Sequence, residues 1–318
     1  MKYYLGIDLG GTFIKGGVVD ENGKIIAKDK VPTEKEKGAE GVMDNVALLI
    51  DKLLAAANLK KSDIGGVGMG VPGMINGKDG IVVISNNLNW LHVEMVKGMK
   101  DRTGLDFTIT NDANAAALGE ATYGVGRDYE DSILLTLGTG VGGGIVLSNR
   151  IVEGNKSAGA ELGHMVICDG GEQCTCGRKG CFEAYCSATA LIRDTKRAML
   201  AHKDSKMWEI GDIEKVSGKT AFDYKDTDKY AREVVDNYIE KLACGIANIA
   251  NIFRPHAVML GGGVCAQGDN LIKPVQKIVD EQIFGTIHGP KCHDATHTYS
   301  RSNPISAAKS LEYYCKTV

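Results

Sequence analysis

The sequence predicts an α/β protein built from two related halves. Apolar segments typical of strands alternate along the chain with segments whose apolar residues recur at helical spacing. A second observation is an internal similarity, because DLGGTFIKGGVV (8–19) aligns without gaps with TLGTGVGGGIVL (136–147). Each segment has the pattern of a strand, a glycine turn and a strand. Two such hairpins, one per half, indicate a duplicated domain with a ligand bound between the halves.

Each expected element of the first half rests on its local pattern. Short apolar segments, in part punctuated by glycine, predict strands, apolar residues at helical spacing predict helices, and Asp112 stands at or next to an N-cap. The expected strands are 3–8, 16–19, 24–30, 64–71 and 107–110. The expected helices are 39–58, 93–103 and 113–121.

The same criteria give the elements of the second half. Its expected strands are 132–137, 145–147 and 257–260, and its expected long helix is 228–253. Residues 201–226 are polar and follow no pattern that predicts an element.

Length and composition exclude several classes of protein. The 318 residues are enough for about two domains. The formal net charge is −3 and no basic block occurs, which argues against nucleic acid or a membrane surface as partner. No apolar run has the roughly 18 residues of a membrane span, and no secretion signal is visible. The nine cysteines are therefore expected to be reduced thiols or metal ligands in a cytoplasmic protein.

The two glycine turns predict a cradle for phosphate groups. Turns without Cβ atoms let backbone N–H groups approach phosphate oxygens closely. Thr12 and Thr139 add hydroxyl donors, Lys15 adds a cation, and Asp8 is placed to hold a hydrated Mg²⁺ on the phosphates. Ordinary tight hairpins are the alternative, and it is the matched pair that favours phosphate binding. SGKT at 217–220 lacks the opening glycine of a P-loop, and neither GxGxxG segment leads into a helix as a Rossmann fold requires.

Asn111-Asp112 follows a strand and begins a helix, which is a common place for a residue that lines a cleft. A kinase needs a carboxylate there to orient a hydroxyl and accept its proton. A plain N-cap aspartate is the alternative, and the residues alone favour it.

The most specific motif is a cluster of one histidine and three cysteines within eighteen residues: His164, Cys174, Cys176 and Cys181. Three thiolates and an imidazole fill a tetrahedral structural zinc site. Cys168 and Cys186 compete as ligands, and free thiols or a redox pair are the alternatives.

Five segments together resemble the ROK family of bacterial sugar kinases and related repressors, and within it the glucokinases. These segments are DLGGTFIK, NDANAAALGE, GTGVGGGI, ELGH and CTCGRKGCFE. The resemblance implies an actin-like ATPase fold (ribonuclease H-like), with two related α/β domains and an interdomain cleft where ATP and sugar meet. It places an N-terminal domain at 1–113 and a C-terminal domain with the zinc loop at 114–303. A C-terminal helix at about 304–318 is expected to pack back on the first domain.

The resemblance also implies roles for individual residues. Phosphate contacts fall on Gly10, Gly11, Thr12, Lys15, Thr139 and Gly140, and Gly262 and Gly263 lie near the adenosine. Asp112 matches the catalytic base. The sugar ligands are Asn111, Glu161, His164 and Glu183, with Asn87 as a weaker candidate. His164, Cys174, Cys176 and Cys181 match the zinc ligands. The segment 299–314 lacks the glycine- and alanine-rich stretch usual at that place.

The implied activity is ATP-dependent phosphorylation of a hexose hydroxyl, with O6 of glucose as the first expectation. Fructose, mannose, allose and the N-acetylhexosamines are alternatives. A sugar-responsive repressor is a different class, and it is disfavoured because a strand begins by Tyr3, which leaves no room for an N-terminal winged helix. The expected partners are a sugar and, by family resemblance, a second copy of the chain.

Overall fold

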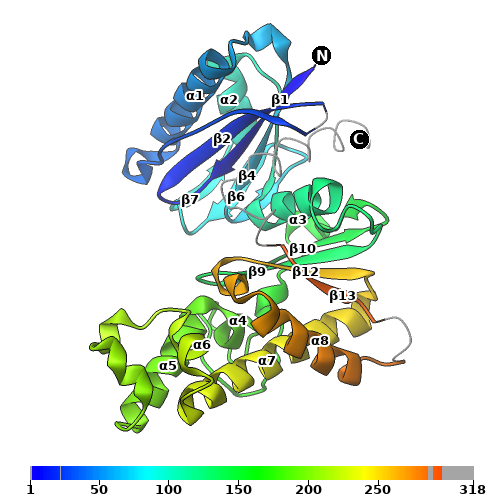
Figure 1. Cartoon of the computed structure of the whole chain (residues 1–318). Coiled ribbons are helices and arrows are strands. Elements are labelled where there is room, and N and C mark those ends of the chain that lie inside the picture. Colours follow the sequence, from blue (N-terminus) through cyan, green and yellow to red (C-terminus); the bar gives the residue numbers. More distant parts are fainter. Residues whose placement is uncertain (1, 22, 286–288, 296–318) are drawn as a thin grey trace. The chain divides into compact units, whose positions relative to one another are not determined.

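The computed structural model describes residues 2–21, 23–285 and 289–295 (Figure 1). Their contacts form two compact units. The described parts of 1–130 and 144–160 make the first unit, and those of 131–143 and 161–297 make the second. The domain boundary expected at residue 113 stays a prediction, and these contacts group residues 114–130 with the first unit. The C-terminal helix expected at 304–318 lies outside the described residues.

The first sheet has five strands in the order β3-β2-β1-β4-β8. β1 pairs with β2 and β2 with β3 in antiparallel fashion, whereas β4 lies parallel to both β1 and β8. The strand expected at 24–30 is thus present as β3, at the edge of this sheet. The strands are β1 (Tyr3–Leu9), β2 (Phe13–Asp20), β3 (Ile25–Pro32), β4 (Ile64–Val71) and β8 (Phe107–Asn111).

Helices pack on both faces of the first sheet. A Cβ at Gly16 of β2 would touch Leu49 and Leu53, so α1 lies against that face. Gly16 is in register with Ile7 of β1, and Ile7 with Met69 of β4, so Met69 shares the α1 face and its neighbour Gly70 points to the other. A Cβ at Gly70 would touch Ala115, so α3 covers that opposite face. The helices are α1 (Gly38–Ala57), α2 (Met95–Thr103) and α3 (Asp112–Tyr123).

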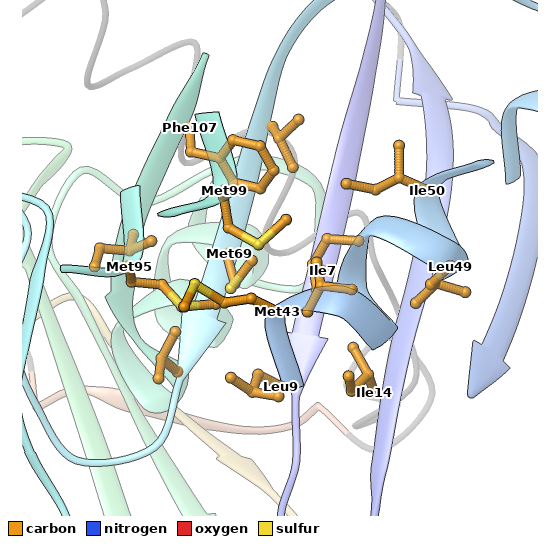
Figure 2. Close-up of a cluster of buried hydrophobic side chains, with 14 of the residues drawn as sticks. Ile7, Leu9, Ile14, Met43, Leu49, Ile50, Met69, Met95, Met99 and Phe107 are labelled. Atoms are coloured by element: carbon orange, nitrogen blue, oxygen red, sulfur yellow. The ribbon is translucent and has the colours of Figure 1, made fainter. Parts of the chain in front are cut away.

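The core of the first unit fills the space between its sheet, α1 and α2. Figure 2 shows Ile7 and Leu9 of β1 facing methionines from both helices. Met43, Met95 and Met99 are all at most 2% exposed. Apolar residues at helical spacing in 39–58 therefore predicted the buried face of α1 correctly.

A small three-stranded sheet, β5-β6-β7, also belongs to the first unit, and no pattern in the sequence predicted it. The residues 86–89 form the turn between its second and third strands. The expected helix at 93–103 is shorter because its first residue ends β7. The strands are β5 (Met74–Asn76), β6 (Ile81–Ser85) and β7 (Trp90–Val93).

The second five-stranded sheet repeats the topology of the first. Its order is β11-β10-β9-β12-β13, and β12 lies parallel to β9 and β13. The hairpin β9–β10 takes the place that the hairpin β1–β2 has in the first sheet, which confirms the duplication read from the internal similarity. The strands are β9 (Ser132–Leu137), β10 (Val141–Leu147), β11 (Arg150–Ile151), β12 (Ala257–Gly261) and β13 (Lys291–Asp294).

The second unit holds most of the remaining helices, and α7 is the longest. The long helix expected at 228–253 is present, and Asp228 caps it by accepting from the N–H groups of Tyr230 and Ala231. The polar stretch 201–226 contains only short helices. The α-helices are α4 (Glu183–Cys186), α5 (Ala188–Ala201), α6 (Thr220–Tyr224), α7 (Lys229–Phe253) and α8 (Asp269–Gln282).

Seven short 3₁₀ helices complete the described elements: η1 (Lys35–Lys37), η2 (Lys61–Asp63), η3 (Asn155–Ser157), η4 (Leu162–His164), η5 (Lys206–Ile210), η6 (Ile213–Lys215) and η7 (Gly263–Gln267). Among the described residues, none of the helices combines the length and apolar composition needed to cross a membrane.

Candidate functional site

The first glycine turn joins β1 to β2. The N–H of Gly10 donates to the carbonyl of Phe13 at 3.1 Å, and this bond closes the turn. Gly11 and Thr12 are exposed at its tip. Asp8 and Lys15 are direct partners across the two strands, so both half-buried side chains lie on one face next to the turn. The turn thus gathers an anion, a cation and exposed backbone at one place.

The catalytic candidate lies at the same edge of the sheet. Asp8 of β1 is in register with Gly70 of β4, and Val71 is in register with Asn111 of β8. Because these strands are parallel, their carboxyl ends meet at one edge. A Cβ at Gly70 would lie 3.4 Å from the Asp112 Cα, so the first turn of α3 packs directly over this glycine. The first unit therefore brings Asp8 and Asp112 to the same edge of the sheet, on either side of β4.

Asn111, rather than Asp112, is the N-cap of α3. Its Oδ1 accepts from the N–H groups of Ala113 at 2.8 Å and Asn114 at 3.3 Å, and its Nδ2 donates to the Gly73 carbonyl at 3.0 Å. Asp112 is exposed, and its Oδ1 accepts from the N–H of Ala113 at 3.0 Å. Because Asn111 already caps the helix, Asp112 is not required as an N-cap. This weakens the alternative that Asp112 is a plain capping aspartate.

Asn87 is exposed in the turn between β6 and β7. This hairpin approaches Asn111 through Gly73, because a Cβ at Gly73 would collide with the carbonyl of Ile84. Gly73 has a φ of +117°, a conformation that favours glycine. The backbone of Pro72-Gly73 therefore connects the turn that carries Asn87 to the cap of α3.

The second glycine turn joins β9 to β10 and is fixed by neighbouring elements. The N–H of Gly138 donates to the carbonyl of Gly140 at 3.0 Å, and Thr139 is exposed. Two residues at the start of α5 donate to its carbonyls: the N–H of Ala188 to Gly138 at 2.7 Å and the hydroxyl of Thr189 to Thr139 at 2.8 Å.

Glu183 also contacts the second turn. Its Oε2 accepts from the N–H of Val141 at 3.0 Å, and a Cβ at Gly140 would collide with the same carboxylate. Its Oε1 accepts from the hydroxyl of Thr175 at 3.2 Å and lies 3.7 Å from the Cys174 Sγ. Glu183, which was predicted as a sugar ligand, thus links the second turn to the loop 174–181, called the cysteine loop below.

Gly262 and Gly263 follow β12 and lie beside the second turn. Gly262 has a φ of +97°, and a Cβ there would approach the carbonyl oxygen of Leu137 to 2.5 Å. Glycine is therefore required at 262 for both conformation and space. Leu137 is the residue that precedes the turn, so the two predicted nucleotide segments of the second unit are adjacent.

The predicted metal ligands form one cluster. One ligand atom from each of His164, Cys174, Cys176 and Cys181 lies within 4.8 Å of all the others. The Sγ atoms of Cys176 and Cys181 are 3.7 Å apart, and the Nδ1 of His164 is 3.7 Å from the Cys174 Sγ. A tetrahedral ion with Zn–S bonds of about 2.3 Å separates its ligands by about 3.7 Å, so the spacing fits zinc. Neither Cys168 nor Cys186 belongs to the cluster.

The cluster has two thiols with opposite pKa shifts. Burial raises the pKa of Cys181 to about 12, whereas a hydrogen bond from the backbone of Arg178 lowers the pKa of Cys176. A divalent cation binds the thiolate form, which would offset the desolvation of Cys181. The donor set therefore suits a metal better than a group of free thiols.

The remaining sugar candidates of the second unit lie beside this cluster. The N–H of His164 donates to the Glu161 carbonyl at 3.0 Å, so η4 places the two residues together. The Nδ1 of His164 is the ring nitrogen that lies 3.7 Å from the Cys174 Sγ, which leaves Nε2 for another partner. The exposed Glu161 has a backbone position fixed by the same turn.

The structure thus groups the predicted residues within each unit. The first unit gathers Asp8, Gly10, Gly11, Thr12, Lys15, Asn111 and Asp112, with Asn87 on the adjoining hairpin. The second unit gathers Thr139, Gly140, Glu183, Gly262 and Gly263, with Glu161, His164 and the three cysteines beside them. Sequence reasoning missed Thr33 and Thr189, whose hydroxyls hold the two turns. No local signal marks either threonine, because each contact joins distant parts of the chain.

Comparison with known proteins agrees with this arrangement. The ROK family model matches residues 4–311. The chain is 38% identical to a glucokinase of Halalkalibacterium halodurans over 87% of this chain and 84% of that protein. It is 37% identical to a glucokinase of Thermotoga maritima over 87% of each chain.

A solved structure shares the whole fold. The crystal structure of a ROK family glucokinase from Streptomyces griseus in complex with glucose and AMPPNP is 31% identical, with a TM-score of 0.80. The match covers 97% of this chain and 98% of that one, and it confirms the actin-like ATPase fold. The chain belongs to the ROK family.

Proposed function

We propose that this protein is an ATP-dependent hexose kinase that transfers the γ-phosphoryl group to glucose. The observation that carries the proposal is the exposed Asp112 at the strand ends of the first unit, in a chain 31–38% identical to glucokinases along most of its length. That arrangement offers a carboxylate for a hydroxyl group beside a turn suited to phosphates. The relative from Streptomyces griseus was solved with glucose and AMPPNP, which supports both substrates.

The two glycine turns would bind the triphosphate. Backbone N–H groups and the hydroxyls of Thr12 and Thr139 supply donors to phosphate oxygens, and Lys15 supplies a positive charge. Asp8 would hold Mg²⁺, which when bound neutralises developing charge on the phosphates. Gly262 and Gly263 would face the adenosine, since their lack of side chains leaves the backbone accessible.

Asp112 would act on the sugar hydroxyl. Its carboxylate accepts the proton as the oxygen attacks phosphorus, and its main contribution is to orient that oxygen in line with the transferred group. The N–H of Ala113 holds one carboxylate oxygen, which fixes the rotamer. Asn111, Glu161, His164 and Glu183 would pair with other hydroxyls, because amide, carboxylate and imidazole groups match their donors and acceptors.

We also propose a structural Zn²⁺ at His164, Cys174, Cys176 and Cys181. Four protein ligands complete a tetrahedron, so no position remains for a reacting water. The ion would fix the loop that carries Cys174 and Thr175, both of which lie beside Glu183. Nε2 of His164 would be left to bond a sugar hydroxyl.

The test of the function is a panel of sugars in an ATP-coupled assay. We expect glucose to give the highest kcat/KM, with the product phosphorylated at O6. A higher kcat/KM for fructose, mannose, allose or an N-acetylhexosamine would replace glucose as the substrate, and no turnover of any sugar would contradict the kinase. Metal analysis should give one zinc per chain. Light scattering should give a homodimer, and fractionation a cytoplasmic protein; both stay predictions.

A further inference from the structure

We infer that Thr33 is a positioning residue for ATP, because it sets the orientation of the peptide groups in the first glycine turn. This inference rests on the proposed function, in which that turn binds phosphate. Thr33 follows β3 and lies 21 residues after the turn. Its hydrogen bonds to the turn go to backbone carbonyls, so it acts on the turn through the backbone.

Two hydrogen bonds connect Thr33 to the turn. Its hydroxyl donates to the carbonyl of Gly10 at 2.6 Å, and its N–H donates to the carbonyl of Thr12 at 2.9 Å. Thr33 is 0% exposed, so water cannot replace its hydroxyl. Two carbonyl groups of the turn are thus held toward the buried side of the hairpin.

The consequence for the N–H groups follows from peptide geometry. In a trans peptide the carbonyl and the next N–H point in opposite directions, and none of the described peptides is cis. With the Gly10 carbonyl facing Thr33, the N–H of Gly11 points away from Thr33. Gly11 is exposed, and a Cβ there would have no atom within 4 Å. Because the residue is exposed and its N–H is directed away from the buried Thr33, we infer that an anion can approach this N–H.

The segment that carries Thr33 is itself anchored to α1. The Nδ2 of Asn45 lies 3.3 Å from the Pro32 carbonyl and 3.2 Å from the Thr33 carbonyl, and it donates to both. It also donates to the Glu34 carboxylate at 2.9 Å. The turn is therefore held through Thr33 and Asn45 to a helix that packs on the core. These hydrogen bonds fix the N–H of Gly11 before ATP binds, and a fixed donor loses less entropy on binding.

The second turn has a related arrangement, which is built from different elements. A threonine hydroxyl again donates to a turn carbonyl, from Thr189 to Thr139, and a backbone N–H again donates to a second one, from Ala188 to Gly138. The donors come from a helix start in this case. Two unrelated segments thus restrain the carbonyls of the two matched turns, which is expected if peptide orientation matters for phosphate binding.

The test compares Thr33→Val with Thr33→Ser in the full-length protein. Valine keeps the shape of threonine and removes the hydroxyl, whereas serine keeps the hydroxyl. We measure the Kd of Mg·ATP by calorimetry, the KM of ATP and of glucose, and the free energy of unfolding. Thr33→Val should raise the Kd and KM of ATP about tenfold and change the glucose KM less than twofold. Thr33→Ser should restore ATP binding to within about threefold of wild type.

A matched control separates positioning from stability. Thr195 is also 0% exposed, and its hydroxyl donates to the Leu191 carbonyl at 2.7 Å within α5. Thr195→Val should lower the free energy of unfolding as Thr33→Val does and leave ATP binding unchanged. The inference is overturned if Thr33→Val binds ATP like wild type, or if it weakens ATP and glucose equally and serine does not rescue. A wild type that binds ATP and phosphorylates no sugar would contradict the proposed function instead, because the comparison of ATP Kd values would stand.

Discussion

The two glycine turns have matching sequences and different supports. The first is held by Thr33, in a segment anchored by Asn45 of α1. The second is held by the start of α5 and by Glu183, which also contacts the cysteine loop. Duplication preserved the hairpin and its place in the sheet, whereas the surrounding elements diverged. Both turns thus have carbonyls held by hydrogen bonds, and different elements hold them.

This difference has a functional consequence. The first turn is held by Thr33, which is not bonded to the cysteine loop, so it should be insensitive to loss of the proposed zinc. The second turn shares Glu183 with Thr175, which stands between two of the predicted zinc ligands. The proposed zinc should therefore influence nucleotide binding through the second turn and not through the first.

The largest effect is expected outside both turns. Asp112→Asn keeps an oxygen for the Ala113 N–H and loses the proton acceptor. We expect kcat to fall by about 10² or more, with the KM values of ATP and glucose nearly unchanged, because the turns still bind. Steady-state kinetics on glucose checks this. A variant with near-normal kcat would show that Asp112 is not the base.

Cys176→Ser should separate the second turn from the first. Cys176 is exposed, so its own packing contributes little and the effect reports the metal. We expect loss of zinc, a fall in Tm of about 5–10 °C and a raised KM for both substrates. Cys168→Ser is the control, since Cys168 lies outside the cluster. Full activity and unchanged Tm in a zinc-free Cys176→Ser protein would mean that the second turn does not depend on metal.

A pair of glycine substitutions tests whether Glu183 stabilises the second turn. A Cβ at Gly140 would displace the Glu183 carboxylate and so remove its bond to Val141, whereas a Cβ at Gly11 would meet nothing within 4 Å. Gly140→Ala should therefore lower the free energy of unfolding by about 1–2 kcal/mol. Gly11→Ala should change it by less than about 0.5 kcal/mol. Denaturant titration measures both, and equal losses would argue against the Glu183 support.

The smallest effect is expected at Thr189. Its hydroxyl is exposed, so water can replace it on the Thr139 carbonyl. Thr189→Val should raise the KM of ATP only about two- to threefold, less than Thr33→Val does. A larger effect at Thr189 than at Thr33 would reverse the order of importance of the two threonines.

The sequence predicted the parts of the fold that local patterns define. Strands such as 64–71 and 132–137 are mainly apolar segments, the first punctuated by glycines, and the long helical pattern at 228–253 corresponds to α7. The metal cluster was predicted because its cysteines lie close together in sequence and their chemistry is specific. The sheet β5-β6-β7 was missed because its strands have three to five residues, too few to show a clear period.

Candidate site residues were predicted from their type and motif. The hydrogen bonds that hold the two turns were not predicted. Thr33 reaches Gly10 across 23 residues, and Glu183 reaches Val141 across 42, so neither contact has a local signature. Glu183 was expected to face a sugar hydroxyl, and the structure adds its bonds to Val141 and Thr175. Asn111 likewise has a capping role in addition to the predicted one. Such roles depend on tertiary contacts, which residue identity alone does not reveal.

We expect the two glycine turns to bind the same nucleotide, as the proposed function requires. The most direct test is calorimetric titration of Mg·AMPPNP and of glucose into wild type, Thr12→Ala and Thr139→Ala. We expect one nucleotide per chain, a Kd for AMPPNP raised about three- to tenfold in each variant, and an unchanged Kd for glucose. A raised Kd for glucose with an unchanged Kd for AMPPNP in both variants would contradict it.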